Sequence, residues 1–168
     1  WVTGCLGASA AAVHAWTAGE QPSPEARAAF ARPVPRIAEA CCLVEQECVD
    51  ALMDLSDGLA GDVGHIAAAS GVKVVLDAGA IPIADAALIA LGVDRALEVA
   101  LHGGEDYELL FVTDPGVVDV DYFEGRFGLD LTCVGRVLEG QGVWIDSGVG
   151  TPQPLECFGF DHFGSTDR

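Results

Sequence analysis

Apolar positions along the chain recur in two patterns, one typical of helices and one typical of buried strands. Over residues 58–69 they lie three and four positions apart, which predicts a helix with one apolar face that ends at Gly71. The next segment, residues 72–77, is rich in β-branched apolar residues and is predicted to be a buried strand. We expect further strands at 1–4, 49–54, 107–113, 131–137 and 143–146, and helices at 8–18, 24–31, 37–47, 84–91, 94–101 and within 115–127. Because helices and strands interleave, the predicted class is α/β (α+β), a mixed β-sheet flanked by helices.

The composition is that of an ordinary folded domain. The 168 residues, 51% of them hydrophobic, can bury a sizeable core, so we expect a single domain over residues 1–168. No apolar stretch is long enough to span a bilayer, so we expect no membrane partner. The 26 acidic residues outnumber the 8 basic ones, and a net charge of −18 would repel a phosphate backbone, so we expect no nucleic-acid partner.

The first residues and the cysteines bear on the compartment. No basic segment followed by an apolar one opens the chain, so no signal peptide is predicted. The six cysteines include no Cys-x-x-Cys pair, and no cysteine and histidine cluster has the spacing of zinc ligands. We therefore expect reduced, mostly buried thiols and a cytoplasmic location. The chain opens with Trp-Val-Thr-Gly, which is predicted to be the end of a strand, and this indicates a piece of a longer protein.

The first candidate for chemistry is Asp54-Leu55-Ser56-Asp57-Gly58, where a predicted strand meets a predicted helix. A helix N-terminus offers free backbone N–H groups and the positive end of a dipole to phosphate. Asp54 and Asp57 could hold Mg²⁺, and the Ser56 hydroxyl could donate to a phosphate. Serine or aspartate before a helix is also an ordinary N-cap, and the spacing alone favours that structural interpretation. Two polar residues further along this helix, Asp62 and His65, are expected on its surface.

Two more segments combine glycine with charged or aromatic residues. Gly103-Gly104-Glu105-Asp106-Tyr107 lies at the end of a predicted strand, where backbone could approach a ligand closely, or where the chain simply turns with solvated acids. Gly159-Phe160-Asp161-His162-Phe163 could stack an aromatic ring on a flat heterocycle, or could close the domain as a hydrophobic plug. The spacing supports no Ser/His/Asp triad and no Walker-type phosphate loop.

In their order and separation, the three segments resemble the thiamine-monophosphate kinases. The wider superfamily of that family includes aminoimidazole ribonucleotide synthetase, selenophosphate synthetase and a hydrogenase maturation factor. Weaker points of similarity are Val2-Thr3-Gly4, Arg32-Pro33-x-Pro35-Arg36 and Cys133-Val134-Gly135. The resemblance spans nearly the whole chain, and it implies the C-terminal domain of the aminoimidazole ribonucleotide synthetase-like fold.

The resemblance also implies a reaction and the residues that support it. Enzymes of the family transfer the γ-phosphoryl group of ATP to thiamine monophosphate, with Mg²⁺ ions bridging the phosphates, and form thiamine diphosphate. In the matching positions Asp54 and Asp57 would be metal ligands and Ser56 would touch ATP. Glu105 and Phe160 would contact the substrate, and no residue is assigned as a catalytic acid or base. Such a transfer depends on positioning and charge neutralisation more than on a covalent nucleophile.

Much of the family's machinery would lie outside this chain. The family has two domains, and the N-terminal one carries further metal-binding aspartates, much of the ATP site and the dimer interface. We therefore expect half of an active site here, an inactive isolated chain and a homodimer at full length. Where the family reads Gly-Asp-Ser-Ala-Ala-Gly-Leu, this chain has Gly7-Ala8-Ser9-Ala10-Ala11-Ala12-Val13, which lacks an acid and a glycine. We interpret that departure as a packing change in the first helix.

Two other hypotheses stay open at this point. The chain could belong to another ATP-using relative of the same fold that acts on a different small molecule, and Glu105 and Phe160 are the residues that would distinguish it. Alternatively, it could be a non-catalytic domain that keeps the fold as a binding or assembly module. The retained set of Asp54, Ser56, Asp57 and Glu105 argues against the second hypothesis, because a purely structural domain has no need of it.

Overall fold

Two four-stranded β-sheets form the centre of the molecule. The computed structural model describes residues 1–46 and 49–156. The first sheet is antiparallel throughout, with strand order β2-β4-β1-β5. The second sheet has the order β6-β3-β7-β8, and β3 and β7 are its parallel pair. The strands are β1 (Val2–Thr3), β2 (Ala51–Asp54), β3 (Lys73–Asp77), β4 (Leu109–Val112), β5 (Leu131–Thr132), β6 (Gly135–Leu138), β7 (Gly142–Asp146) and β8 (Gln153–Pro154).

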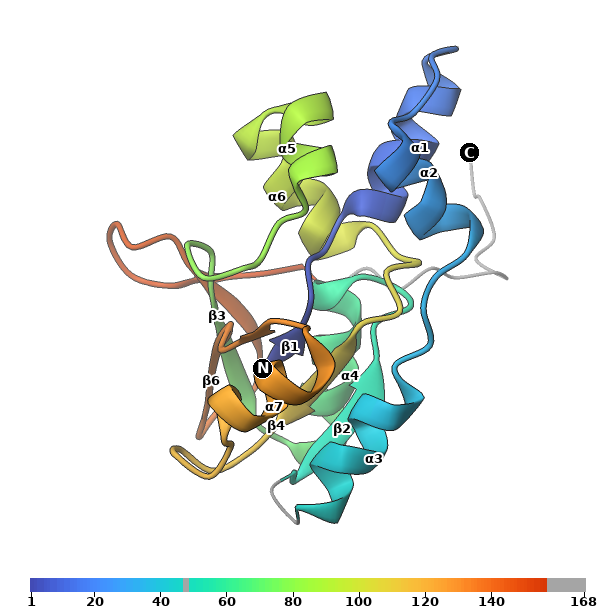
Figure 1. Cartoon of the computed structure of the whole chain (residues 1–168). Helices are drawn as coiled ribbons and strands as arrows, with labels where there is room; N and C mark the ends of the chain where they lie inside the picture. Colours follow the sequence, from blue (N-terminus) through green and yellow to red (C-terminus); the bar gives the residue numbers. More distant parts are fainter. Residues whose placement is uncertain (47–48, 157–168) are drawn as a thin grey trace.

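Four helices gather at one end of the sheets (Figure 1). They are α1 (Ala8–Thr17), α2 (Pro24–Ala31), α5 (Asp85–Leu91) and α6 (Val93–His102). Helix α2 begins as its sequence predicts, because the Ser23 hydroxyl accepts the N–H of Ala26 and Pro24 occupies the first turn. The core between these helices is built from small residues, which lets their backbones approach closely: Ala11, Ala12, Ala26, Ala86, Ala87 and Ala96.

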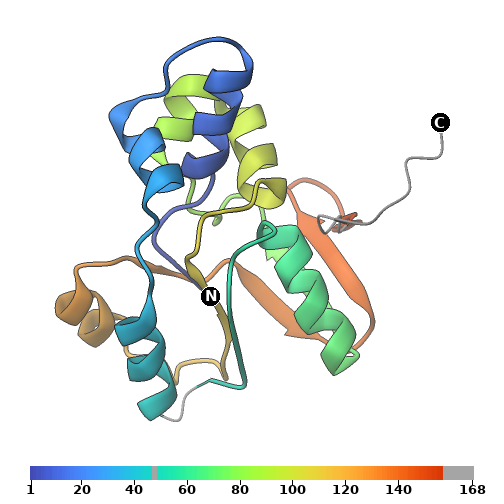
Figure 2. The same cartoon turned by 90° about the vertical axis from the view of Figure 1, so that its right-hand side faces the viewer.

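The remaining helices cover the sides of the sheets (Figure 2). Helix α4 (Leu59–Ser70) packs against the second sheet and ends at Gly71, which adopts the left-handed conformation of a C-cap. Helices α3 (Ile37–Glu45) and α7 (Val120–Phe127) lie on the opposite side of the molecule in this view. Their apolar side chains join those of the first sheet in one buried cluster: Leu43, Leu109, Phe111, Phe123 and Leu131.

The predicted α/β class is confirmed, and three details of the strands differ from expectation. The strands form two sheets, of which the second is mixed. The segment expected to be one strand over 131–137 is divided between the sheets, with β5 in the first and β6 in the second. At Gly135 the chain passes so close to β3 that a Cβ atom would overlap the carbonyl oxygen of Val75, so glycine is needed there. Strand β8 was not expected.

The structure describes four of the six cysteines; these four are free thiols, and most of them are not buried. Cys42 lies in the core, whereas Cys5, Cys41 and Cys133 are exposed, so the expectation of mostly buried thiols is wrong. Cys5 and Cys133 lie in connections between elements and Cys41 lies on the exposed side of α3, which the count of cysteines could not reveal.

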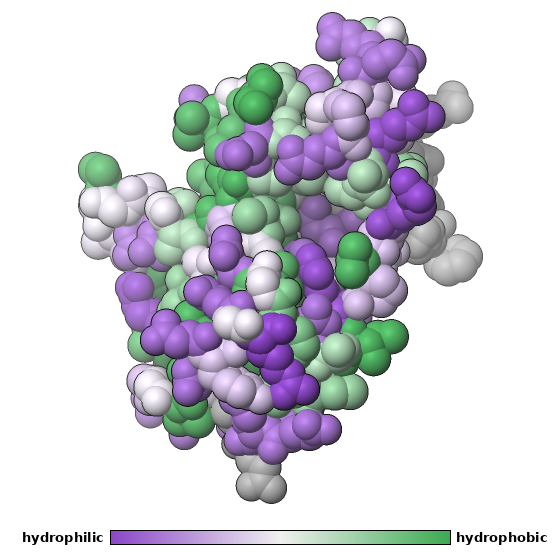
Figure 3. Space-filling view, viewed as in Figure 1, coloured by the Kyte–Doolittle hydropathy of each residue, from purple (hydrophilic) through white to green (hydrophobic). Residues whose placement is uncertain are grey.

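The surface in Figure 3 mixes hydrophilic and hydrophobic residues, and hydrophobic atoms gather over α5. Exposed apolar side chains at this end include Ile89 and Val93, which are 86% and 70% exposed. Within the described residues, no helix has both the length and the apolar character needed to cross a membrane.

Candidate functional site

Two of the three segments singled out in the sequence lie against each other at one end of the first sheet. Strand β2 ends at Asp54, which is paired with Leu109 at the start of β4. The segment 54–58 therefore leaves the sheet beside the segment 103–108 that enters it. This pairing brings the predicted metal and phosphate residues next to the predicted substrate residue.

Backbone hydrogen bonds continue between the two segments beyond the last strand pair. The Leu55 N–H donates to the carbonyl oxygen of Glu108 at 2.8 Å, and the Tyr107 N–H donates to that of Leu55 at 2.8 Å. The Glu105 N–H then donates to the carbonyl oxygen of Ser56 at 3.0 Å. The two segments thus form one joined loop pair, although more than forty residues of sequence separate them.

Glycine is required at two points of this contact. A Cβ atom at Gly104 would overlap the carbonyl oxygen of Ser56. A Cβ atom at Gly58 would lie 2.9 Å from the carbonyl carbon of His102, and the φ angle of Gly58 is +94°, a conformation that favours glycine. The glycines noted in the sequence therefore serve the close approach of two backbones.

Glu105 and Tyr107 hold unusual backbone conformations. Among the described residues they are the non-glycine residues with positive φ, at 70° and 52°. Their side chains meet, because the Tyr107 hydroxyl donates to the Glu105 carboxylate at 3.1 Å. That hydrogen bond and the nearby charges of Glu105, Asp54 and Asp57 raise the pKa of Tyr107 above its ordinary value. Strain of this kind is found where a site needs particular groups presented outward.

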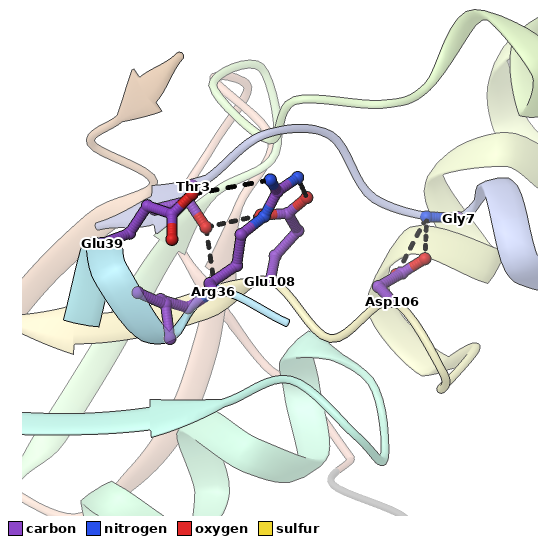
Figure 4. A network of polar contacts seen from close by, with 7 residues as sticks. Thr3, Gly7, Arg36, Glu39, Asp106 and Glu108 are labelled. Atoms are coloured by element: carbon purple, nitrogen blue, oxygen red, sulfur yellow. Dashed lines mark hydrogen bonds and ion pairs between the residues drawn. The ribbon is translucent and has the colours of Figure 1, made fainter. Parts of the chain in front are cut away.

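Asp106 points the other way, toward the N-terminus of α1 (Figure 4). Its carboxylate accepts the Gly7 N–H at 3.1 and 3.0 Å. Helix α1 has no side-chain cap of its own, so the Asp106 carboxyl supplies the acceptor for an N–H at its N-terminus. Burial is the main cause that raises the pKa of Asp106 to about 7.

Asp62 is buried, so the expectation of a surface position is wrong. It is 1% exposed, and its carboxylate accepts the N–H groups of Ser56 at 2.9 Å and Asp57 at 3.1 Å. Gly58 has no side chain to cap helix α4, and Asp62 folds back from that helix to hold the preceding loop. Burial raises the pKa of the Asp62 carboxyl. His65 is exposed, as expected.

These hydrogen bonds change which groups are free to meet a phosphate. The N–H groups of Ser56 and Asp57 are already donated to Asp62, so they are not the open donors that the sequence suggested. The Ser56 hydroxyl remains as a donor in the loop.

Oxygen and nitrogen ligands converge beside this loop. One oxygen each from Asp57 and Asp62 and one ring nitrogen of His65 all lie within 4.8 Å of one another. Carboxylate oxygens are the ligands that Mg²⁺ prefers, and the set is compatible with a divalent cation. Asp54, the other predicted metal ligand, is exposed at the end of β2 and is not in this group.

The structure thus places four of the five predicted site residues in one region. Ser56 and Asp57 are half-buried, and Asp54 and Glu105 are exposed. Phe160 lies outside the described residues. Sequence reasoning assigned no role to Tyr107 and missed the inward-facing acids, because nothing in Glu-Asp-Tyr-Glu distinguishes the acids that face inward from the one that faces outward.

Known proteins are similar to this chain in sequence. Residues 2–146 match the family of AIR synthase related proteins, C-terminal domain. The chain belongs to this family. It is 37% identical over 176 residues to the thiamine-monophosphate kinase of Salmonella typhimurium, covering 98% of this chain and 52% of that protein. It is 32% identical to that of Pyrococcus abyssi, covering 96% and 48%. The chain therefore spans about half the length of the curated relatives it matches.

Solved structures give the same result. The thiamine-monophosphate kinase of Stenotrophomonas maltophilia superposes with a TM-score of 0.81 at 38% identity, covering 87% of this chain and 49% of that one. AaThiL in complex with AMPPCP and TMP superposes with a TM-score of 0.76 at 30% identity, covering 96% and 50%. Escherichia coli HypE, at 18% identity and a TM-score of 0.70, shares the fold. The resemblance predicted from the sequence motifs is confirmed.

The strain at Glu105 leads to a stability prediction. Glycine adopts positive φ freely, whereas the left-handed conformation costs other residues about 1–2 kcal/mol. Glu105→Gly and Glu105→Ala both remove the carboxylate, but only Glu105→Gly also removes the strain of the positive φ angle. We expect urea unfolding to show Glu105→Gly more stable than Glu105→Ala by about 1 kcal/mol. Equal stability would mean that no strain is held at this position.

The raised pKa of Asp106 predicts a pH dependence. Between the ordinary pKa of 3.8 and the folded value of about 7, the folded protein binds a proton that the unfolded chain releases. The contribution of Asp106 to stability therefore declines as pH rises through this window. We expect the free energy of unfolding of the wild type, relative to Asp106→Asn, to fall as pH rises across it. Parallel curves for the two proteins in urea titrations would contradict the assignment.

Proposed function

We propose that residues 1–168 form the C-terminal domain of a cytoplasmic, homodimeric thiamine-monophosphate kinase, with an N-terminal domain outside this chain. The whole protein would transfer the γ-phosphoryl group of ATP to thiamine monophosphate. The observation that carries the proposal is the joined loop pair, which brings Asp54, Ser56 and Asp57 beside Glu105. The family supports the proposal, because the chain matches proteins that are named for this activity. The length of those relatives supports it too, because the chain covers about half of each.

We expect magnesium as the cation at this site, because carboxylate oxygens are its preferred ligands. Asp54 and Asp57 would hold it, and Asp62 and His65 lie close enough to Asp57 to contribute. When bound, Mg²⁺ neutralises charge on the phosphates and aligns their oxygens. A chain with a net charge of −18 would otherwise repel ATP and thiamine monophosphate.

The protein groups at the site orient the reactants. The Ser56 hydroxyl would donate to a phosphate of ATP, since the backbone donors beside it are occupied by Asp62. The Glu105 carboxylate, held by the Tyr107 hydroxyl, would contact thiamine monophosphate. Phe160 would pack its ring against the thiamine moiety. These roles amount to positioning two anionic substrates in line, which is the main protein contribution to phosphoryl transfer.

A product assay tests the proposal. The natural full-length protein is incubated with ATP, Mg²⁺ and thiamine monophosphate, and the thiamine phosphates are separated by chromatography. We expect thiamine diphosphate from the full-length protein and none from the 168-residue chain alone. A folded full-length protein that binds ATP and forms no thiamine diphosphate would instead indicate an ATP-using relative with a different acceptor.

The same assay tests the metal role of Asp57. Asp57→Asn in the full-length protein should lower kcat on the order of a hundredfold or more, because a metal supplies several kcal/mol of charge stabilisation. The matched control is Asp121→Asn, which removes an exposed carboxylate on α7. Thermal unfolding of both variants should stay close to that of the wild type. Near-normal turnover by folded Asp57→Asn would remove this residue from the metal site.

A further inference from the structure

The segment Glu105–Glu108 presents alternate side chains to opposite sides. Glu105 and Tyr107 face the candidate site with positive φ angles, while Asp106 and Glu108 point into the protein. A backbone in this conformation persists only where the surroundings hold it. Asp106 and Glu108 are therefore the residues whose contacts can hold Glu105 and Tyr107 in this conformation.

Glu108 is held by residues distant in sequence (Figure 4). Its carboxylate accepts the Arg36 Nε–H at 2.9 Å and an Arg36 terminal N–H at 2.6 Å. The Thr3 hydroxyl donates to it at 2.6 Å and in turn accepts the Leu109 N–H at 2.8 Å. Gly4 leaves room for this arrangement, because a Cβ atom there would lie 2.5 Å from a Glu108 carboxylate oxygen.

Arg36 is suited to act as a fixed anchor. It ends Arg32-Pro33-Val34-Pro35-Arg36, the motif noted in the sequence that the proposed function leaves without a role. Two prolines restrict the backbone of the segment that delivers it. The side chains of Arg36 and Glu108 are 19% and 9% exposed, so water screens their two-point ion pair less than a surface pair.

We propose that Arg36 is a positioning residue: by binding Glu108 at two points, it holds Glu105 and Tyr107 in their strained, outward-facing conformation at the candidate site. The importance of that conformation for substrate binding rests on the proposed function. The anchoring itself is a property of the free protein and can be measured without substrate.

Hydrogen exchange of the full-length protein tests the anchoring. The N–H groups of Glu105 and Tyr107 donate to Ser56 and Leu55, so they are protected while the loop pair is closed. In Arg36→Met we expect exchange in the peptide spanning 103–108 to be at least about tenfold faster, with the protection of α4 and α7 unchanged. Arg27→Met, which removes an exposed arginine on α2, is the matched control and should exchange like the wild type.

Two further variants separate anchoring from a general loss of stability. Arg36→Met leaves the Glu108 carboxylate buried without its charged partner, which is costly in itself. The double variant Arg36→Met with Glu108→Gln removes that carboxylate's charge, and we expect the 103–108 peptide still to exchange faster. Arg36→Lys keeps the charge but not the two-point geometry, and we expect an intermediate rate.

Kinetics of the same variants connect the anchor to function. We expect Arg36→Met to raise the KM for thiamine monophosphate about tenfold and to leave the KM for ATP within about twofold, because the displaced residues face the acceptor. Unchanged exchange at 103–108 in folded Arg36→Met, or wild-type exchange in the double variant, would overturn the positioning role. Failure of the wild type to form thiamine diphosphate would overturn the proposed function alone, and the exchange result would still decide the anchor.

Discussion

The close contact between the backbones of residues 54–58 and 103–108 is the constraint on which the site depends. Two antiparallel strands end together, and their hydrogen bonds continue into the loops as far as Glu105 and Ser56. The contact requires Gly104, where a side chain would overlap the opposite backbone. It brings carboxylates from two distant parts of the sequence to the same end of the first sheet.

The acidic residues of these loops divide into two groups by the direction they face. Asp62, Asp106 and Glu108 point inward, and each accepts hydrogen bonds from backbone, hydroxyl or guanidinium groups. Asp54 and Glu105 are exposed, Asp57 is half-buried, and these three are the acids proposed to meet ligands. A buried carboxylate is costly unless it is hydrogen-bonded, so the inward group fixes the loops while the outward group gives them their chemistry.

The local pattern of the sequence predicted most helices and strands, because propensity, proline and glycine act over a few residues. Helix α2 has the predicted bounds, Pro24–Ala31. Contacts between distant residues were not predictable in this way: Arg36 and Glu108 are 72 positions apart, and nothing near Asp62 indicates that it turns back toward its own loop. The resemblance indicated which segments form the site, and the structure shows that two of them are hydrogen-bonded to each other. The metal, ATP and substrate roles stay predictions, and Phe160 lies outside the described residues.

Paramagnetic broadening by Mn²⁺ is the most direct test of the central claim, that the loop 103–108 lies beside a metal site held by the loop 54–58. In the ¹⁵N-labelled full-length protein, Mn²⁺ and ATP replace Mg²⁺ and ATP, and amide signals are followed by NMR. The account predicts that amides in 54–58 and 103–107 broaden together at low Mn²⁺, while those of α7 keep their intensity. Broadening of one loop without the other, or of neither, would contradict it.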